Sequence, residues 1–300
     1  MVNARDELLP RITWDRAREI TGYAAPPPSV VQQQADGFQA ELCAMASKPQ
    51  EAITQEELWY YHHDLWRSEL QPDLFACLLP VCLMDWHATL MANRPCSHGD
   101  SELHLGLWRS QALERLLDER QRGLVFAFLR DGFLDRIDQE RGFRYVGSGT
   151  PAYAWMGRLC SLGYVMPDIS LVWDAWWAME SPGAAVAVIQ WCSGLMYREG
   201  ENPLFGPWTN AGGGGGPYLW ESDSHICDAG WLPANVEFLR EALGLFRVRD
   251  GLERALLRLH GEPEEERAGP IVADFSKRAG LVAERAGELV RMLAVDGSPG

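Results

Sequence analysis

Three short stretches combine histidine, cysteine and carboxylate side chains, the residue types that bind metals or transfer protons. In the first, His62, His63 and Asp64 are consecutive within a segment of helical spacing. Adjacent side chains on a helix point about 100° apart, so these two histidines cannot easily chelate one ion. We expect one histidine to be packed and the other solvated, because a metal site here would need a ligand from elsewhere in the chain.

The second stretch places Cys96, His98, Asp100, Glu102 and His104 at alternating positions. In an extended strand these side chains would line one face, which would suit a zinc site or an acid–base site. The same residues also fit the start of a helix, where Asp100 or the following serine caps the first turn and Glu102 lies near the positive end. Both interpretations stay open.

The third stretch, residues 223–228, alternates Asp223, His225 and Cys227 directly after a long irregular segment. These residues could form a thiolate–imidazole pair or a metal site, and ordinary hydrogen bonding in a loop is the alternative. The glycines at 212–216 precede this stretch but are followed by Pro217, whereas a phosphate-binding loop ends in lysine and serine or threonine. We expect these glycines to form a flexible tether or a mobile lid.

Aromatic residues indicate a function more clearly, because the chain contains 13 tryptophans. Trp173, Trp176 and Trp177 follow the spacing i, i+3, i+4 and predict a seam between helices. Residues 197–231 have no periodicity and mix aromatic with acidic side chains, a composition typical of a hot spot for a basic protein. The same aromatics could instead line a small-molecule pocket or hold the loop on the core. The predicted partner-binding surface comprises Trp208, Tyr218, Trp220, Glu221, Asp223, Asp228 and Trp231.

Composition limits the classes of partner. The chain has 300 residues, of which 47% are hydrophobic and 23% charged, so it is globular and not globally disordered. Its 27 basic and 42 acidic residues give a net charge of −15. Such acidity argues against nucleic acid or anionic lipid as the main ligand, because both require cationic side chains. It is compatible with a basic protein partner.

Compartment is predicted from the terminus, the apolar runs and the cysteines. Residues 1–20 are charged and have no apolar core, so we expect no secretory signal. The longest apolar run, residues 74–92, includes Pro80, Asp85 and His87, which favours a buried helix pair over a membrane span. The seven cysteines are odd in number and irregularly spaced, as expected of free, largely buried thiols in a reducing cytosol. We therefore expect a cytoplasmic protein.

Apolar spacing, capping residues and prolines predict a mainly α, multi-helix globular fold. Cap signals include Thr54 with Glu57, Pro72 at a first turn, and Ser181 before Pro182. One helix is predicted to follow Thr54. Pro80 should kink or split the helix that contains it, and Gly123 should end the helix that begins near residue 102. The other predicted helices cover residues 5–20, 29–46, 72–91, 102–122, 124–137, 150–162, 168–179, 184–196, 233–243, 252–260 and 276–294.

A stretch rich in glycine at residues 142–149 is the best candidate for a boundary. We expect an N-terminal helical subdomain over residues 1–142 and a C-terminal helical subdomain over residues 143–300, which includes the long irregular loop 197–231. Runs rich in Val and Ile at 170–173 and 185–189 also fit short strands, so a small β element near residues 170–220 is an alternative.

A resemblance to bacterial immunity proteins of polymorphic-toxin and type VI secretion systems is carried by two helix-rich stretches, TQEELWYYHHDLWRSELQPDLFACLLPVCLMDW and ERQRGLVFAFLRDGFLDRI. The resemblance covers residues 54–137 and includes no diagnostic motif, so no family residue is carried over. It implies a cytoplasmic antidote that binds one secreted toxin, often a nuclease or other hydrolase, and occludes it.

Since no catalytic, metal-binding or cofactor motif stands out, we expect a binding protein rather than an enzyme, with no cofactor and with a basic cognate toxin as its partner. A helical enzyme that uses His98–His104 or Asp223–Asp228 is the alternative, and a scaffold or adaptor helix bundle is a third reading. The sequence does not predict the oligomeric state.

Overall fold

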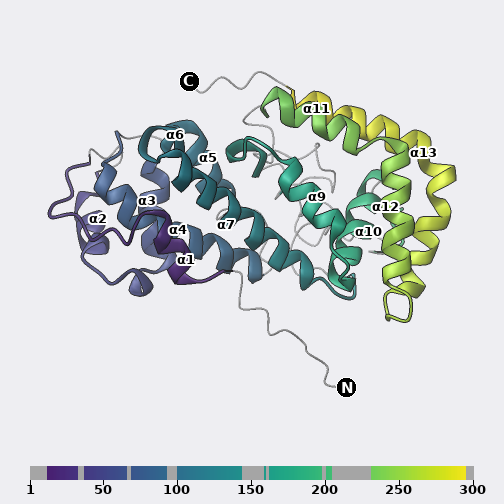
Figure 1. Cartoon of the computed structure of the whole chain (residues 1–300), viewed down its shortest axis with the longest axis horizontal. Coiled ribbons are helices and arrows are strands. Elements are labelled where there is room, and N and C mark those ends of the chain that lie inside the picture. Colours follow the sequence, from purple (N-terminus) through teal and green to yellow (C-terminus); the bar gives the residue numbers. More distant parts are fainter. Residues whose placement is uncertain are drawn as a thin grey trace.

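A computed structural model of the chain describes residues 12–32, 37–65, 69–92, 100–143, 159, 162–197, 201–204 and 231–294. Within these ranges the chain forms helices and turns and no strand, which confirms the predicted mainly α fold (Figure 1). The helices are α1 (Trp14–Ile20), α2 (Gln39–Ala46), the 3-10 turn η1 (Gln50–Ala52), α3 (Gln55–Leu65), α4 (Pro72–Met91), α5 (Asp100–Ser110), α6 (Ala112–Leu116), α7 (Glu119–Asp138), α9 (Ser170–Ala178), α10 (Pro182–Met196), α11 (Pro233–Ala242), α12 (Leu245–Arg258) and α13 (Glu265–Leu293).

Two apolar helices, α4 and α10, form the centres of the two halves of the molecule. Helix α4 packs against α1, α2, α5 and α7, whereas α10 packs against α7, α9, α12 and α13. Helices that are apolar on nearly every side need neighbours all round, which explains both positions. The length and composition of α4 would also suit a membrane span, but 67% of its most apolar stretch is buried inside the protein. Pro80 lies within α4, which is one continuous helix and not the predicted pair.

The predicted helix over residues 29–46 is too long, because α2 begins only at Gln39. The backbone N–H groups of Val31 and Gln32 donate instead to the side-chain oxygen of Gln71, at 2.7 and 3.2 Å. In return, the backbone N–H of Gln71 donates to the side chain of Gln32 at 3.0 Å. Contacts between segments far apart in the sequence thus replace the hydrogen bonds that a helix would have supplied.

The predicted helix over residues 102–122 is also divided differently. Helix α5 ends at Ser110, and Gln111 follows in the left-handed region with φ of 50°. Helix α7 then begins after Asp118, whose carboxylate accepts from the backbone N–H of Gln121 at 2.8 Å, while the Gln121 side chain accepts from the backbone of Asp118 at 3.0 Å. This capping box starts the helix. Helix α7 continues through Gly123, so the predicted break at this glycine is wrong.

The alternative of strands at 170–173 and 185–189 is wrong, because these residues belong to α9 and α10. Asp168 accepts a hydrogen bond from the backbone of Ser170 at 3.0 Å, and Ser181 accepts one from the backbone of Ala184 at 3.2 Å. Both contacts satisfy first-turn donors and so favour helices over extended chain. The part of the proposed β region beyond residue 204 lies outside the described residues.

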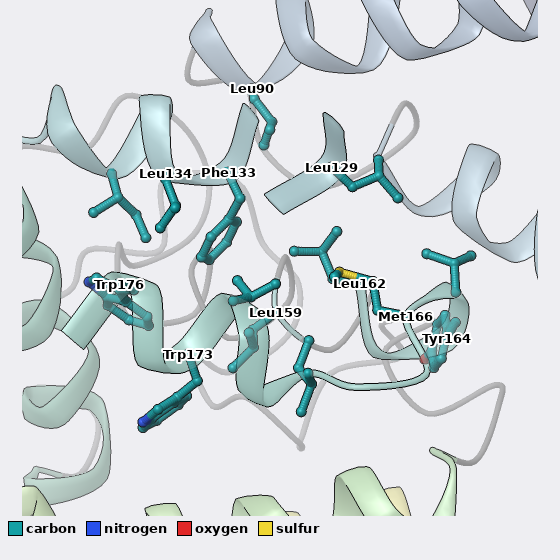
Figure 2. Close-up of a cluster of buried hydrophobic side chains, with 14 of the residues drawn as sticks. Leu90, Leu129, Phe133, Leu134, Leu159, Leu162, Tyr164, Met166, Trp173 and Trp176 are labelled. Atoms are coloured by element: carbon teal, nitrogen blue, oxygen red, sulfur yellow. The ribbon is translucent and has the colours of Figure 1, made fainter. Parts of the chain in front are cut away.

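Helix α7 connects the two halves, since it packs on α1 and α4 and also on α9 and α10. Phe133 on α7 faces Trp176 on α9, with ring centroids 6.1 Å apart (Figure 2). Near its end, buried Arg136 forms an ion pair with buried Glu140, which also accepts from Gln190 of α10 at 3.3 Å. The buried core therefore continues past the predicted boundary near residue 142. The division into two subdomains stays a prediction.

The predicted tryptophan seam is present and buried. Trp173 stacks on Trp177 with centroids 4.9 Å apart, and Trp176 lies 5.9 Å from Trp191 of α10 in an edge-to-face arrangement. The ring of Trp177 also covers Gly251 of α12, where an added Cβ would overlap the indole. The seam thus joins α9 to α10 and α12.

Substituting Gly251 with alanine should therefore destabilise the protein. We expect Gly251→Ala to lower the free energy of unfolding by about 2 kcal/mol or more, because the new methyl group must displace a buried indole. Gly123→Ala is the matched control, since nothing lies within 4 Å of its Cβ position in α7. Alanine there should raise stability by up to about 1 kcal/mol. Urea unfolding measures both changes, and equal effects would contradict the described packing.

Candidate functional site

Six of the seven residues predicted to bind a partner lie outside the described residues: Trp208, Tyr218, Trp220, Glu221, Asp223 and Asp228. The seventh, Trp231, is only 5% exposed, so it is part of the core and not of an exposed surface. Its backbone N–H donates to the carbonyl of Leu293 at 2.9 Å, and its indole occupies the space beside Gly163. Trp231 thus holds the start of α11 against the end of α13, the third of the roles considered for these aromatics.

The alternating residues at 96–104 do not form the extended face that a shared site would need, because residues 100–110 are helical. Cys96 and His98 lie outside the described residues, as do the side chains of Asp100 and Glu102. His104 is 1% exposed, and its ring lies 5.7 Å from that of Trp86. Burial lowers the pKa of His104 to about 3, so this imidazole is neutral at physiological pH.

The side chains of His62 and Asp64 are also buried inside the protein. His62 is 5% exposed, and burial lowers its pKa to about 4. Asp64 is 4% exposed and accepts a hydrogen bond from the side chain of Gln32 at 2.6 Å. Packing of His62 agrees with the expectation that one of the two histidines is buried. In the part of the chain that the structure describes, no three His, Cys, Asp or Glu side chains group as metal ligands.

The remaining candidates are placed only in part. His225 and Cys227 lie outside the described residues, so the alternative site at 223–228 stays a prediction. Of the seven cysteines, Cys77, Cys82 and Cys192 are buried free thiols, and Cys43 is free and exposed. Burial raises the pKa of each of the three buried thiols, which keeps them protonated and poorly nucleophilic.

A partly exposed aromatic cluster lies elsewhere, where α2 meets α3. The ring of Phe38 lies 4.9 Å from that of Tyr60 and 5.9 Å from that of Trp59, between centroids. Trp59 is 46% exposed, which is unusual for a side chain with so much apolar area. This cluster was not among the predicted sites, although Glu56, Trp59 and Tyr60 have the i, i+3, i+4 spacing of one helix face.

Carboxylates accompany these rings. Glu56 is exposed one turn before Trp59 on α3, and Glu41 is exposed one turn after Phe38 on α2. Of the five acidic residues in 37–65, Glu51 pairs with Arg18 of α1 and Asp64 is buried, so Glu41 and Glu56 are the carboxylates exposed beside the rings. We call Phe38, Glu41, Glu56, Trp59 and Tyr60 the α2–α3 aromatic surface.

Two other charged residues nearby, Glu57 and Lys48, stabilise the fold through a helix cap and an ion pair. Glu57 caps the first turn of α3, because it accepts from the backbone N–H of Thr54 at 3.0 Å. It also pairs with Lys48, whose hydrogen bond is the main reason that the pKa of Glu57 is lowered. Lys48 is thereby neutralised, and the predicted capping box of Thr54 and Glu57 is confirmed.

Comparisons of this chain with protein-family models, with curated proteins and with solved structures found no match. The function must therefore be argued from the residues themselves.

The burial of His62 predicts a specific loss of stability in acid. Its pKa is about 4 in the folded protein and about 6.5 when unfolded, so only the unfolded chain takes up a proton between these values. Stability should fall as pH decreases through this window, by about 1.4 kcal/mol per pH unit from this group.

We expect His62→Gln to lessen the slope of unfolding free energy against pH between 6.5 and 4.5 by about 1.4 kcal/mol per pH unit, while buried His104 keeps its own contribution. Urea titrations at several pH values measure the slope. The exposed His260 supplies the control: His260→Gln should keep the steep loss. Parallel pH profiles for the wild type and His62→Gln would show that the imidazole is not held neutral by burial.

Proposed function

We propose that this chain is a binding protein that neutralises a basic cognate toxin by covering its active surface, as immunity proteins do. The observation that supports this proposal best is the α2–α3 aromatic surface, which joins an exposed indole to carboxylates. Tryptophan and tyrosine contribute most to binding when they lie in the centre of an interface. Surrounding carboxylates would attract a basic partner and fix its orientation.

The net charge of −15 supports the same class of partner. A long-range negative field accelerates encounter with a basic protein and weakens as salt screens it. Bacterial toxins that act on nucleic acids carry basic surfaces for their phosphate substrates, so a nuclease fits this chemistry well. The expected assembly is a stoichiometric complex in which the α2–α3 aromatic surface contacts the toxin.

Co-expression tests the proposal directly. Each gene next to the one for this chain is expressed in a host with and without the chain, and growth is measured. One neighbouring product should be toxic alone and harmless when the chain is present. Absence of protection against every neighbouring product would refute the proposed function.

The α2–α3 aromatic surface can be tested with the protected pair. We expect Trp59→Ala to weaken the complex by about 30-fold, equivalent to about 2 kcal/mol, because it removes the main apolar anchor. Glu56→Lys should mainly slow association, with an effect that decreases at high salt. Titration calorimetry and stopped-flow association measure the two changes.

Phe246→Ala is the matched control, because Phe246 is an aromatic residue that is 72% exposed on α12. This variant should bind like the wild type. If Phe246→Ala weakens the complex and Trp59→Ala does not, the partner binds the C-terminal half and the assignment of the surface is wrong.

A further inference from the structure

A cavity of about 480 Å³ lies between the turn that joins α11 to α12 and the last turns of α13. We call it the α11–α13 cavity, and it lies at the end of the molecule where α11 and α13 run side by side (Figure 1). Its apolar lining includes Leu243, Ala286 and Val290, each of which is largely buried. This volume falls within the range that small ligands occupy in proteins, about 300–1,000 Å³.

The charge of this cavity is opposite to that of the whole chain. Two arginines line it, Arg240 from α11 and Arg291 from α13, and none of its lining residues carries a carboxylate. Arg240 also pairs at the surface with Glu237 of α11, at 3.2 Å, so an anion bound here would share Arg240 with that carboxylate. Helices α11 to α13 (residues 233–293) contain ten basic and eleven acidic residues, whereas the whole chain contains 27 and 42. An anion is therefore the complementary charge for this cavity.

Two glycines, Gly244 and Gly287, also line the cavity. Gly287 of α13 lies beside Arg291, whose guanidinium nitrogen is 3.7 Å from the position a Cβ would take. Gly244 precedes α12, which starts at Leu245 with no side-chain cap and no acidic residue in its first turn. Because Gly244 and Leu245 line the cavity, the positive end of α12 adds to the field of the two arginines.

From this arrangement we infer that the α11–α13 cavity binds an aliphatic carboxylate of medium chain length. The hydrocarbon chain would lie on Leu243, Ala286 and Val290, and the carboxylate would accept hydrogen bonds from Arg240 and Arg291. We infer a small molecule rather than a helix of a partner, because the volume lies in the range of small-ligand sites. This site lies apart from the α2–α3 aromatic surface and does not depend on the proposed function.

Three eight-carbon probes separate the contributions of charge and apolar contact: octanoate, 1-octanol and octylammonium. Titration calorimetry of the full chain at low salt should show one octanoate site. Octanoate should bind at least about tenfold more tightly than 1-octanol, because charge-assisted hydrogen bonds add to the apolar contact. Octylammonium should bind most weakly. Equal affinity for the three probes, or no binding of octanoate at millimolar concentration, would overturn the inference.

Variants locate the site. Arg240→Gln and Arg291→Gln should each weaken octanoate about tenfold and leave 1-octanol unchanged. Arg254→Gln is the matched control, because Arg254 pairs with Asp250 on its own helix, as Arg240 pairs with Glu237, but does not line the cavity. A loss of octanoate affinity in Arg254→Gln as large as in the two cavity variants would show nonspecific charge binding and overturn the inference.

Variants that fill the cavity test whether the hydrocarbon chain of octanoate binds inside it. Gly287→Leu should abolish octanoate binding, with folding checked by circular dichroism. Should that variant not fold, Ala283→Leu fills the same cavity from an exposed position of α13. Undiminished octanoate binding in a folded cavity-filling variant would overturn the assignment to this cavity.

Discussion

The packing of the α9 tryptophans is the interaction on which the rest of the architecture depends. Trp176 contacts Phe133 of α7 and Trp191 of α10, and Trp177 covers Gly251 of α12. The short helix α9 therefore contacts α7 from the N-terminal half of the chain and α10 and α12 from the C-terminal half. Aromatic pairs bury a large apolar area and also prefer particular ring geometries, so this cluster fixes the relative position of the halves as well as stabilising them.

Buried polar contacts specify the register that apolar packing alone leaves open. Arg285 of α13 donates to the carbonyls of Gly194 and Tyr197 at 2.6 and 2.7 Å, and so caps the end of α10. Asn235 of α11 donates to the carbonyl of Met166 and accepts from the backbone of Ile169, at 2.8 and 3.0 Å. A buried polar group without its partners is costly, so each contact penalises a shifted arrangement of the helices.

The elements that could be predicted are those whose causes are local. Thr54 and Ser181 cap helices through residues three positions away, and the spacing of Trp173, Trp176 and Trp177 shows their common face. The start of α2 could not be predicted, because the side chain of Gln71 engages the residues before it. The burial of Trp231 could not be predicted either, because the composition of an irregular segment does not show which aromatic rings pack in the core. Trp59 could have been found from its helix face, but its exposure depends on where Phe38 lies.

The two proposed binding surfaces lie in different halves of the molecule, with α2 and α3 at one end of the long axis and α12 and α13 at the other (Figure 1). Any energetic coupling between them would have to pass through α4, α7 and α10, which fill the middle. Coupling requires an element with two alternative arrangements, each favoured by a different occupant. The middle of the molecule leaves little room for a second arrangement: a Cβ at Gly132 of α7 would lie 2.6 Å from the Trp86 ring of α4. The α2–α3 aromatic surface and the α11–α13 cavity share no lining residue, so each can be tested by its own variants.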